Sequence, residues 1–164
     1  MNTVHVFTDG ACSNNGTTYS QGGLGVFFPE WREHNLSEKL PITPRATNNR
    51  AELSAVVRAL QQCDLIDPNK EARLVVHSDS ALVCGTVGTW MHTWKRLGWL
   101  KLNRRPPSNL DLLQTLDGLL QHRTVIMKHV RAHTGRLDPD SMHNAAADEL
   151  ATSAVRPLTR SDTT

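Results

Sequence analysis

Hydrophobic and polar residues alternate near the start of the chain, which predicts strands that bury one face. Residues 3–9 (TVHVFTD) alternate and are rich in β-branched side chains, and residues 22–28 do likewise, with the glycine-bearing segment 10–23 between them. We expect these two strands to form a hairpin. A weaker strand over residues 34–40 should end at Pro41, because proline cannot sit inside a central ladder.

A helical repeat replaces the alternation at residue 48. Apolar residues recur every three or four positions in segment 48–62, which predicts a helix with one buried face. These residues are Leu53, Val56, Val57 and Leu60. Residues 73–78 (RLVVHS) predict a buried strand, and a brief helix should follow from Asp79 until Gly85 and Gly88 end it.

The remaining pattern predicts three helices and one strand. A helix is expected over residues 89–99, and Asn109 should cap the next, which carries a leucine-rich face. Its leucines are Leu112, Leu113, Leu116, Leu119 and Leu120. A last strand over 124–130 and a loop over 131–142 lead to a final helix over 144–155.

The order of these elements indicates an α/β fold. Adjacent strands followed by alternating strands and helices predict a mixed sheet with helices packed against it. A chain of 164 residues suits one hydrophobic core. We therefore expect one domain over residues 1–155 and a polar C-terminal tail over 156–164.

Composition narrows the class of protein. A hydrophobic content of 38% and a charged content of 21% are ordinary for a globular domain, and apolar runs stay below the roughly 18 residues of a membrane span. The N-terminus has no basic stretch leading into an apolar block, so an intracellular location is expected. Cys12, Cys63 and Cys84 are widely spaced, which favours free thiols over disulfides or a zinc site.

Positive charge is concentrated in one segment, although the net charge of +2 indicates little by itself. Between Trp90 and Leu110 there are five basic residues and no acidic ones: Lys95, Arg96, Lys101, Arg104 and Arg105. Phosphate backbones attract such patches. A solvated helix face is the simpler interpretation of the basic run taken alone.

Four carboxylates lie where predicted elements begin or end, and the carboxyl ends of strands are common ligand sites: Asp9, Glu52, Asp79 and Asp148. Each also has a structural interpretation. Glu52 completes a capping box with Asn49, Asp79 can cap the helix that follows it, and Asp148 near a helix N-terminus would favour the macrodipole. Taken singly, the structural interpretation is the more common one.

Five motifs change this balance: TDGACSNNG, TNNRAEL, HSDS, VRAHTG and HNAAADELA occur in this order, and four of them contain one of the carboxylates. With them the chain resembles the type 1 ribonuclease H family from Val4 to about Ala154. The resemblance implies a five-stranded mixed sheet of order 3-2-1-4-5 with helices on both faces. Asn14-Asn15-Gly16 stands where many bacterial members have G-N-P-G, which is closer to the eukaryotic form.

The resemblance implies a monomeric endoribonuclease that cuts the RNA strand of an RNA/DNA hybrid and leaves 5′-phosphate and 3′-hydroxyl ends. It implies that the four carboxylates hold two divalent ions, Mg²⁺ or Mn²⁺, with Asp9 bridging both. Four close negative charges need such cations, and oxygen ligands select Mg²⁺ or Mn²⁺ over zinc. His133 matches the family's histidine that moves protons or eases product release.

The substrate contacts are also carried over from the resemblance. The residues that match RNA-strand contacts are Cys12, Asn14, Asn15, Asn48 and Asn49, although turn and cap chemistry also explains the asparagines. The residues that match DNA-strand contacts are Arg45, Thr47 and Asn109 in a phosphate pocket, with Trp90, Trp94, Lys95 and Arg96 in a basic protrusion. Trp99 is expected to be structural. Leu97 and Leu102 depart from the family pattern of this protrusion.

Other interpretations share part of this pattern. A ribonuclease H domain of a reverse transcriptase would carry every motif, but the start at Met1 and the basic protrusion favour a free-standing protein. A silent hybrid-binding module should have lost a carboxylate, and all four are present. Resolvases and integrases share the fold but lack the combination of TNNRAEL and the protrusion. Cellular or viral origin, the compartment and the biological hybrid stay open.

Overall fold

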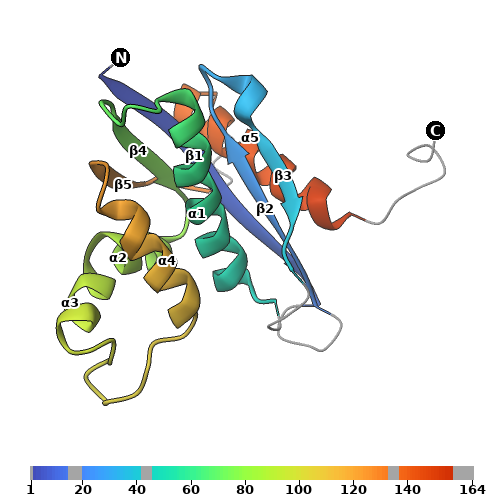
Figure 1. Ribbon diagram of the computed structural model, residues 1–164. Helices are drawn as coiled ribbons and strands as arrows, with labels where there is room; N and C mark the ends of the chain where they lie inside the picture. The colour runs from blue at the N-terminus through green and yellow to red at the C-terminus, as the bar shows by residue number, and fades with distance from the viewer. Residues whose placement is uncertain (1, 15–19, 42–45, 133–136, 157–164) are drawn as a thin grey trace.

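A five-stranded sheet of order β3-β2-β1-β4-β5 forms the centre of the computed structural model, which describes residues 2–14, 20–41, 46–132 and 137–156 (Figure 1). Its strands are β1 (Thr3–Ser13), β2 (Gln21–Phe27), β3 (Leu36–Lys39), β4 (Arg73–Ser78) and β5 (Val125–His129). β1 pairs antiparallel with β2 and parallel with β4. The mixed sheet is as the order of elements predicts, and its strand order is the one that the family resemblance implies.

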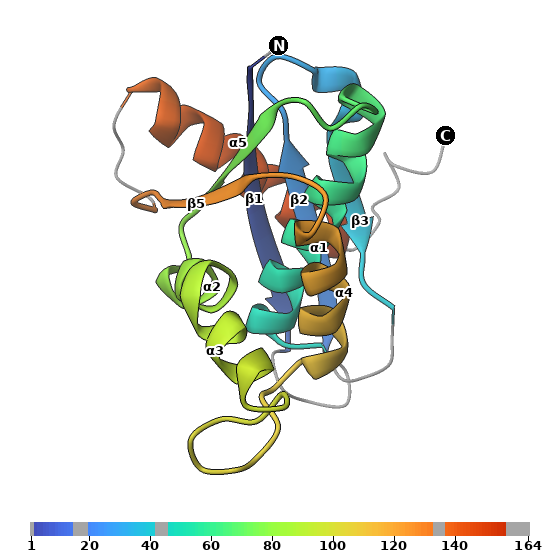
Figure 2. The same cartoon turned by 60° about the vertical axis from the view of Figure 1, so that its left-hand side comes forward.

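Helices cover both faces of the sheet. The long helix α1 and its neighbour α4 lie on one face, and α5 lies on the other (Figure 2). The helices are α1 (Asn48–Ile66), α2 (Ala81–Gly85), α3 (Met91–Arg96), α4 (Leu110–Leu120) and α5 (Pro139–Val155), with a 3-10 turn η1 (Arg32–His34) and a π turn η2 (Thr86–Trp90). Among the described helices, none is long and apolar enough to span a bilayer.

Two apolar clusters hold these layers together. The larger lies between the sheet and α1 and includes Val6, Val56 and Leu74, each fully buried. The smaller lies under α5 and consists of Phe7, Phe27, Val130 and Ala147. Burying such side chains stabilises the fold by about 1.5–3 kcal/mol each. The three cysteines are free thiols, as expected.

Glycine on β2 lets α5 approach the sheet closely. A Cβ at Gly23 would lie 2.8 Å from the carbonyl oxygen of Ala151, and one at Gly25 would overlap the carbonyl oxygen of Ala147. Because these contacts are with helix backbone, α5 could not yield without moving as a whole. The glycines of β2 therefore fix the distance at which α5 crosses the sheet.

The segment predicted to separate the first two strands is partly strand. β1 continues through Gly10 to Ser13, and the continuation pairs with β2, where Gly10 faces Leu24 and Cys12 faces Gly22. The prediction was wrong because glycine and polar residues indicate a turn locally, whereas the ladder to β2 satisfies their backbone groups. Helix α1 likewise extends four residues past the predicted end at residue 62, to Ile66.

Neither Gly85 nor Gly88 ends a helix, contrary to prediction. The chain passes from α2 through the π turn η2 into α3 without leaving helical conformation, and Gly85 has φ −66° and ψ −42°. A Cβ at Gly85 would lie 2.7 Å from Cη2 of Trp90. Gly85 therefore provides room for an indole ring. The helix ends at Arg96, three residues before the predicted end at Trp99, where φ is +64°.

Helix α5 starts five residues earlier than predicted, at Pro139 instead of Asn144. Asp138 caps it by accepting a hydrogen bond from the Ser141 backbone N–H at 3.1 Å, and proline suits the first helical position. The loop prediction over 131–142 was therefore too long. The predicted tail begins at residue 156, and residues 157–164 lie outside the described part of the chain.

Candidate active site

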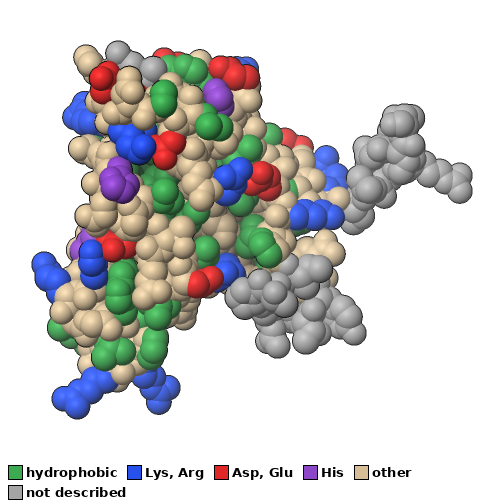
Figure 3. Space-filling model, in the orientation of Figure 1, with side chains coloured by type: hydrophobic (Ala, Val, Ile, Leu, Met, Phe, Trp, Pro, Cys, Tyr) green, Lys and Arg blue, Asp and Glu red, His purple; other side chains and the backbone are tan. Residues whose placement is uncertain are grey.

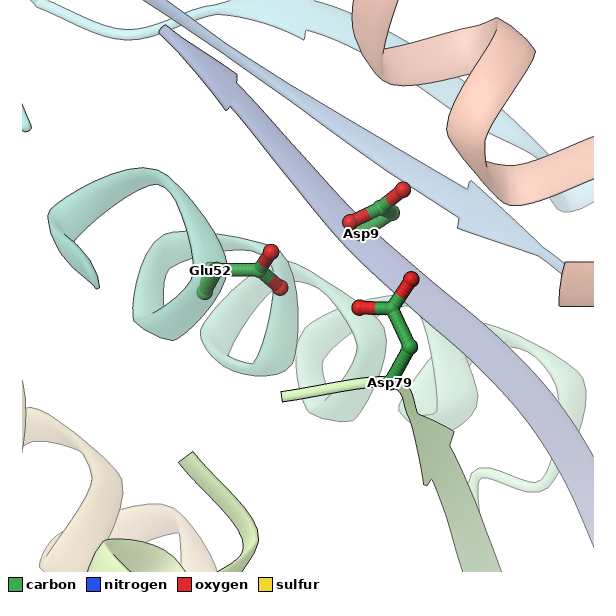
Figure 4. A group of neighbouring side chains, drawn as sticks. All are labelled: Asp9, Glu52 and Asp79. Atoms are coloured by element: carbon green, nitrogen blue, oxygen red, sulfur yellow. The ribbon is translucent and has the colours of Figure 1, made fainter. Parts of the chain in front are cut away.

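Three of the predicted carboxylates converge beside the central strands. Asp9 lies on β1, and Asp79 directly follows β4, whose last register pair with β1 joins Thr8 to Ser78. Glu52 reaches the same place from the second turn of α1. A carboxylate oxygen from each lies within 4.8 Å of the other two, and Figure 4 shows the three side chains pointing toward one another.

The structural roles proposed for these carboxylates belong to other residues. Thr47, not Asn49, caps α1, because its Oγ1 accepts a hydrogen bond from the Arg50 N–H at 3.1 Å. Ser80, not Asp79, caps α2 in the same way. Asp148 lies in the middle of α5, away from the N-terminus. Capping and the macrodipole therefore do not explain the positions of Glu52, Asp79 or Asp148.

Gly10 allows α1 to come close enough for Glu52 to reach Asp9. Its N–H donates to Oδ1 of Asp9 at 2.9 Å. A Cβ at Gly10 would lie 2.6 Å from the carbonyl carbon of Ala51 and 2.8 Å from the Cβ of Ala51. Its φ is not positive, so the position needs glycine for space and not for backbone conformation. Gly10 thereby determines the separation between β1 and the start of α1.

Burial and mutual repulsion perturb the cluster. Burial raises the pKa of Asp9 to about 10, and the nearby carboxylates of Glu52 and Asp79 add to the rise. Burial also raises the pKa of Glu52 to about 7, although its hydrogen bonds with Asp9 and with the Gly10 N–H oppose that rise. Without cations the site therefore retains a proton at neutral pH.

Asp148 stands beside this cluster. Its side chain adds to the rise in the Asp9 pKa through a hydrogen bond, and its charge raises the pKa of Glu52. It does not belong to the group whose oxygens all lie within 4.8 Å of one another. Three of the four predicted carboxylates are thus gathered tightly, and the fourth faces them from α5.

The donor set fits a hard divalent cation. Each of the three clustered groups offers carboxylate oxygen, which Mg²⁺ and Mn²⁺ prefer over nitrogen or sulfur ligands. Oε2 of Glu52 is buried and has no hydrogen-bond partner among the described residues. A buried oxygen of this kind costs free energy, and a bound cation would offset that cost.

Asn144 is a site residue that the sequence interpretation missed. It is 3% exposed, and its Nδ2 donates to Oδ2 of Asp79 at 3.4 Å. Its Oδ1 is buried without a hydrogen-bond partner among the described residues. The signal was available, since Asn144 precedes Asp148 by four residues and therefore shares its helix face.

The residues predicted to contact the RNA strand fall on two segments. Cys12 and Asn14 lie at and just past the end of β1, and Asn48 and Asn49 form the first turn of α1. Both segments adjoin carboxylates of the cluster in sequence. Asn15 lies outside the described residues, as does His133, the predicted proton carrier.

The predicted phosphate-pocket residues are partly described. Thr47 caps α1, whereas Arg45 lies outside the described residues. Asn109 precedes α4 but does not cap it with its side chain, so that prediction was wrong. Its φ of 60° and ψ of 34° place it in the left-handed region, and its Oδ1 instead accepts a hydrogen bond from Arg50 at 3.2 Å.

The predicted protrusion runs from Trp90, the last residue of η2, through α3 into the segment after it. Lys and Arg side chains project from this end of the molecule (Figure 3). Trp90 is 43% exposed, whereas Trp94 and Trp99 are partly buried against the larger core. Lys95 forms an ion pair with Asp117 of α4 at 2.9 Å. An apolar side chain also lies on this surface, since Leu102 is 90% exposed.

Comparison with known proteins agrees with this geometry. The sequence model of the family described as RNase H matches residues 1–156. The ribonuclease H of the bacterium Nitrosomonas eutropha is 39% identical over 96% of this chain and 93% of its own length. That relative is bacterial, whereas the Asn14-Asn15-Gly16 segment is closer to the eukaryotic form of the family.

Solved structures share the fold. LC9-RNase H1, described as a type 1 RNase H with the type 2 active-site motif, has a TM-score of 0.70 and 26% identity over 94% of this chain and 72% of its own. LC11-RNase H1, solved in complex with an RNA/DNA hybrid, has a TM-score of 0.63 and 20% identity over 93% of this chain and 96% of its own.

Proposed function

The chain belongs to the RNase H family, and from this premise we propose how its residues cut the RNA strand of an RNA/DNA hybrid. The chain is accordingly a hydrolase that cleaves this strand endonucleolytically. The observation that carries the proposal is the cluster of Asp9, Glu52 and Asp79, whose carboxylate oxygens meet within 4.8 Å. Neutral side chains at these positions would leave no charge for a cation to offset.

The proposed cofactor is a pair of Mg²⁺ ions, for which Mn²⁺ could substitute. Asp9, Glu52, Asp79 and Asp148 would hold them, and Asp9 interacts with the other three carboxylates. When bound, the ions supply an activated water and neutralise charge that develops at phosphorus. The all-oxygen donor set and the unpartnered Oε2 of Glu52 support this assignment.

The chain's own residues prepare the site. The Gly10 N–H holds one oxygen of Asp9, and the Asn144 amide holds one oxygen of Asp79, so both carboxylates keep a fixed orientation. Asp9 is 4% exposed, and its removal from water strengthens electrostatic interactions with its neighbours. His133 would move a proton near the departing oxygen, a role that its near-neutral reference pKa suits.

Two sets of residues would distinguish the strands of the hybrid. Cys12, Asn14, Asn15, Asn48 and Asn49 would contact the RNA strand and its 2′-hydroxyls, which tell RNA from DNA. Arg45, Thr47, Asn109, Trp90, Trp94, Lys95 and Arg96 would contact the DNA strand. The exposure of Trp90 suits packing on a deoxyribose, whereas Trp94 is partly buried and offers less surface for such a contact.

We further propose that the protein acts as a monomer inside the cell. A single chain supplies all four carboxylates, so catalysis requires no residue from a second copy. Size-exclusion chromatography with light scattering measures the mass in solution. A mass near 18.2 kDa is expected, and a stable dimer would contradict the proposal.

Cleavage of matched substrates tests the proposed function. The protein is incubated with Mg²⁺ and a labelled RNA/DNA hybrid, duplex RNA, duplex DNA or single-stranded RNA of the same sequence. We expect cuts in the RNA of the hybrid alone, with 5′-phosphate and 3′-hydroxyl ends, and complete loss in EDTA. Hybrid binding without cleavage would indicate a silent module, and cleavage of the other substrates would indicate a broader nuclease.

A further inference from the structure

Arg50 touches two residues of the predicted DNA-phosphate pocket at once. It is the third residue of α1, and its backbone N–H donates to Oγ1 of Thr47 at 3.1 Å. Its side chain crosses to the start of α4, where Nη1 donates to Oδ1 of Asn109 at 3.2 Å. A single residue thus joins two positions that are 62 residues apart in sequence.

Both contacts use the acceptor atom of the partner. A guanidinium group has donors and no acceptor, so the amide atom of Asn109 that faces Arg50 must be its oxygen. The NH₂ group of Asn109 is therefore left to donate elsewhere. In the same way the Thr47 oxygen accepts from a backbone N–H, which leaves the hydroxyl hydrogen to donate. Donors of this kind suit a phosphate, which offers acceptors alone.

The guanidinium itself is held in place. Nη1 and Nη2 of Arg50 donate to Oδ1 and Oδ2 of Asp111 at 3.0 and 2.7 Å, the bidentate geometry that fixes an arginine most firmly. The Arg50 side chain is 13% exposed, and hydrogen bonding to it lowers the pKa of Asp111, which therefore stays charged. Lysine at this position could not reproduce the fork.

Asn109 does not act as a side-chain cap of α4 in this arrangement. It stands in the N-cap position of α4 with φ of 60°, yet its side chain makes no capping hydrogen bond. Left-handed backbone is tolerated by asparagine better than by most residues. The side-chain oxygen accepts from Arg50 instead of capping the helix, and this contact fixes the orientation of the amide NH₂ donor.

We propose that Arg50 is a positioning residue for a phosphate of the DNA strand: by occupying the acceptor oxygens of Thr47 and Asn109, it turns the donors of both side chains toward the substrate. The proposal rests on the function proposed above. It predicts that Arg50 affects substrate binding through Asn109 without contacting the reacting atoms.

A double-mutant cycle tests the side-chain half of this arrangement. Arg50→Lys keeps the positive charge and the backbone N–H to Thr47 but removes the fork that orients Asn109. Hybrid affinity is measured in EDTA by fluorescence anisotropy for wild type, Arg50→Lys, Asn109→Ala and the double variant. We expect Arg50→Lys to raise the Kd about tenfold, the loss of one hydrogen bond to a charged group. In the Asn109→Ala background the same change should alter Kd by less than about twofold.

Steady-state kinetics adds a second readout. Arg50→Lys should raise KM with little change in kcat, because a binding contact and not the chemistry is lost. The affinity for a hybrid relative to duplex RNA of the same sequence should fall, since the contact is made to the DNA strand.

Arg58→Lys is the matched control. Arg58 lies eight residues further along α1 and forms the same kind of bidentate pair, with Glu38 at 2.8 and 3.2 Å. We expect any loss of thermal stability to be similar in the two variants, but the Kd to be unchanged in Arg58→Lys. Asn109→Asp still accepts from Arg50 but has no donor, and it should bind the hybrid more weakly than Asn109→Ala.

The outcomes separate the two proposals. A wild-type protein that neither binds nor cuts the hybrid contradicts the proposed function itself. If wild type cuts the hybrid, an unchanged Kd in Arg50→Lys overturns the inference about Arg50 alone. An equal effect of Arg50→Lys in both backgrounds, or an equal effect of Arg58→Lys, would overturn it as well, because Arg50 would then act through general stability.

Discussion

Replacing Gly10 with alanine tests whether close packing of α1 on β1 assembles the site. The new Cβ would lie 2.6 Å from the carbonyl carbon of Ala51 and 2.8 Å from its Cβ. Carbon atoms pack at about 3.5–4.0 Å, so the start of α1 must retreat by about 1 Å. Most of the obstacle is helix backbone, and neither it nor the Cβ of Ala51 can rotate away as a long side chain could.

The displacement carries Glu52 away from Asp9. A misplacement of about 1 Å at a reacting centre can reduce the rate roughly a hundredfold, and overpacking costs about 1–3 kcal/mol of stability. We therefore expect kcat for hybrid cleavage to fall about a hundredfold, the half-saturating Mg²⁺ concentration to rise, and the free energy of unfolding to fall by about 1–3 kcal/mol. Cleavage kinetics across a Mg²⁺ titration and urea denaturation measure these quantities.

Gly118→Ala is the control for the glycine-to-alanine change. A Cβ at Gly118 of α4 would meet nothing within 4 Å among the described residues. In a helix interior the change should raise stability by about 0.5–1 kcal/mol and leave cleavage unchanged. Wild-type kcat and Mg²⁺ dependence in Gly10→Ala would refute the reasoning, because α1 would then not need this approach to place Glu52.

Three further perturbations follow from the contacts of the site and the core. In EDTA the thermal stability should fall as pH rises from 4.5 through about 7 and on to about 10, because the folded pKa values of Glu52 and Asp9 lie above their unfolded values. Asp9→Asn should flatten this dependence of stability on pH. An unchanged slope in the variant would contradict the pKa assignment. Asn144→Ala should weaken Mg²⁺ binding or activity about 10–100-fold, because Asp79 loses the amide that orients it. Wild-type Mg²⁺ affinity in calorimetry together with wild-type kcat would argue against an orienting role for Asn144. Arg123→Met should lower the free energy of unfolding, measured by urea denaturation, by about 3–5 kcal/mol, because it leaves Asp67 buried without its partner. A loss below about 1 kcal/mol would show that the ion pair contributes little.

The fold could be predicted because its periodic segments agree with their tertiary environment. The apolar run of β4 is buried as predicted, and the stripe of α1 that carries Leu53, Val56 and Leu60 faces the larger core. The parallel pairing of β1 with β4 then brings residues that follow Thr8 and Ser78 to one place. Two carboxylates 70 residues apart meet for this reason, a convergence that the family resemblance implied and the periodicity alone did not.

Element ends were harder to predict because local preference does not determine them. Gly10 to Ser13 has the composition of a turn, yet the partner strand β2 extends the ladder. Gly85 has the appearance of a helix terminator, but its missing side chain accommodates the Trp90 ring. Asn109 stands in a cap position, but Arg50 competes for its oxygen. In each case a contact distant in sequence decides the conformation.

Asn144 was missed for a related reason. A single asparagine in a polar helix segment is ordinarily a surface residue. Its spacing of four residues from Asp148 indicates a shared helix face, but its burial and its contact with Asp79 depend on tertiary packing that the spacing alone does not reveal. The earlier start of α5 at Pro139 likewise places Asp148 in the middle of the helix, whereas the prediction had it near the start.

The most direct test of the account is hybrid cleavage by Asp9→Asn. Asparagine keeps the shape of the side chain and an oxygen that can accept from the Gly10 N–H, but it removes the charge that the other carboxylates surround. We expect the variant to bind the hybrid with nearly the wild-type Kd and its cleavage rate in Mg²⁺ to fall by at least about a thousandfold. Cleavage at the wild-type rate would contradict the claim that the carboxylate cluster is the catalytic centre.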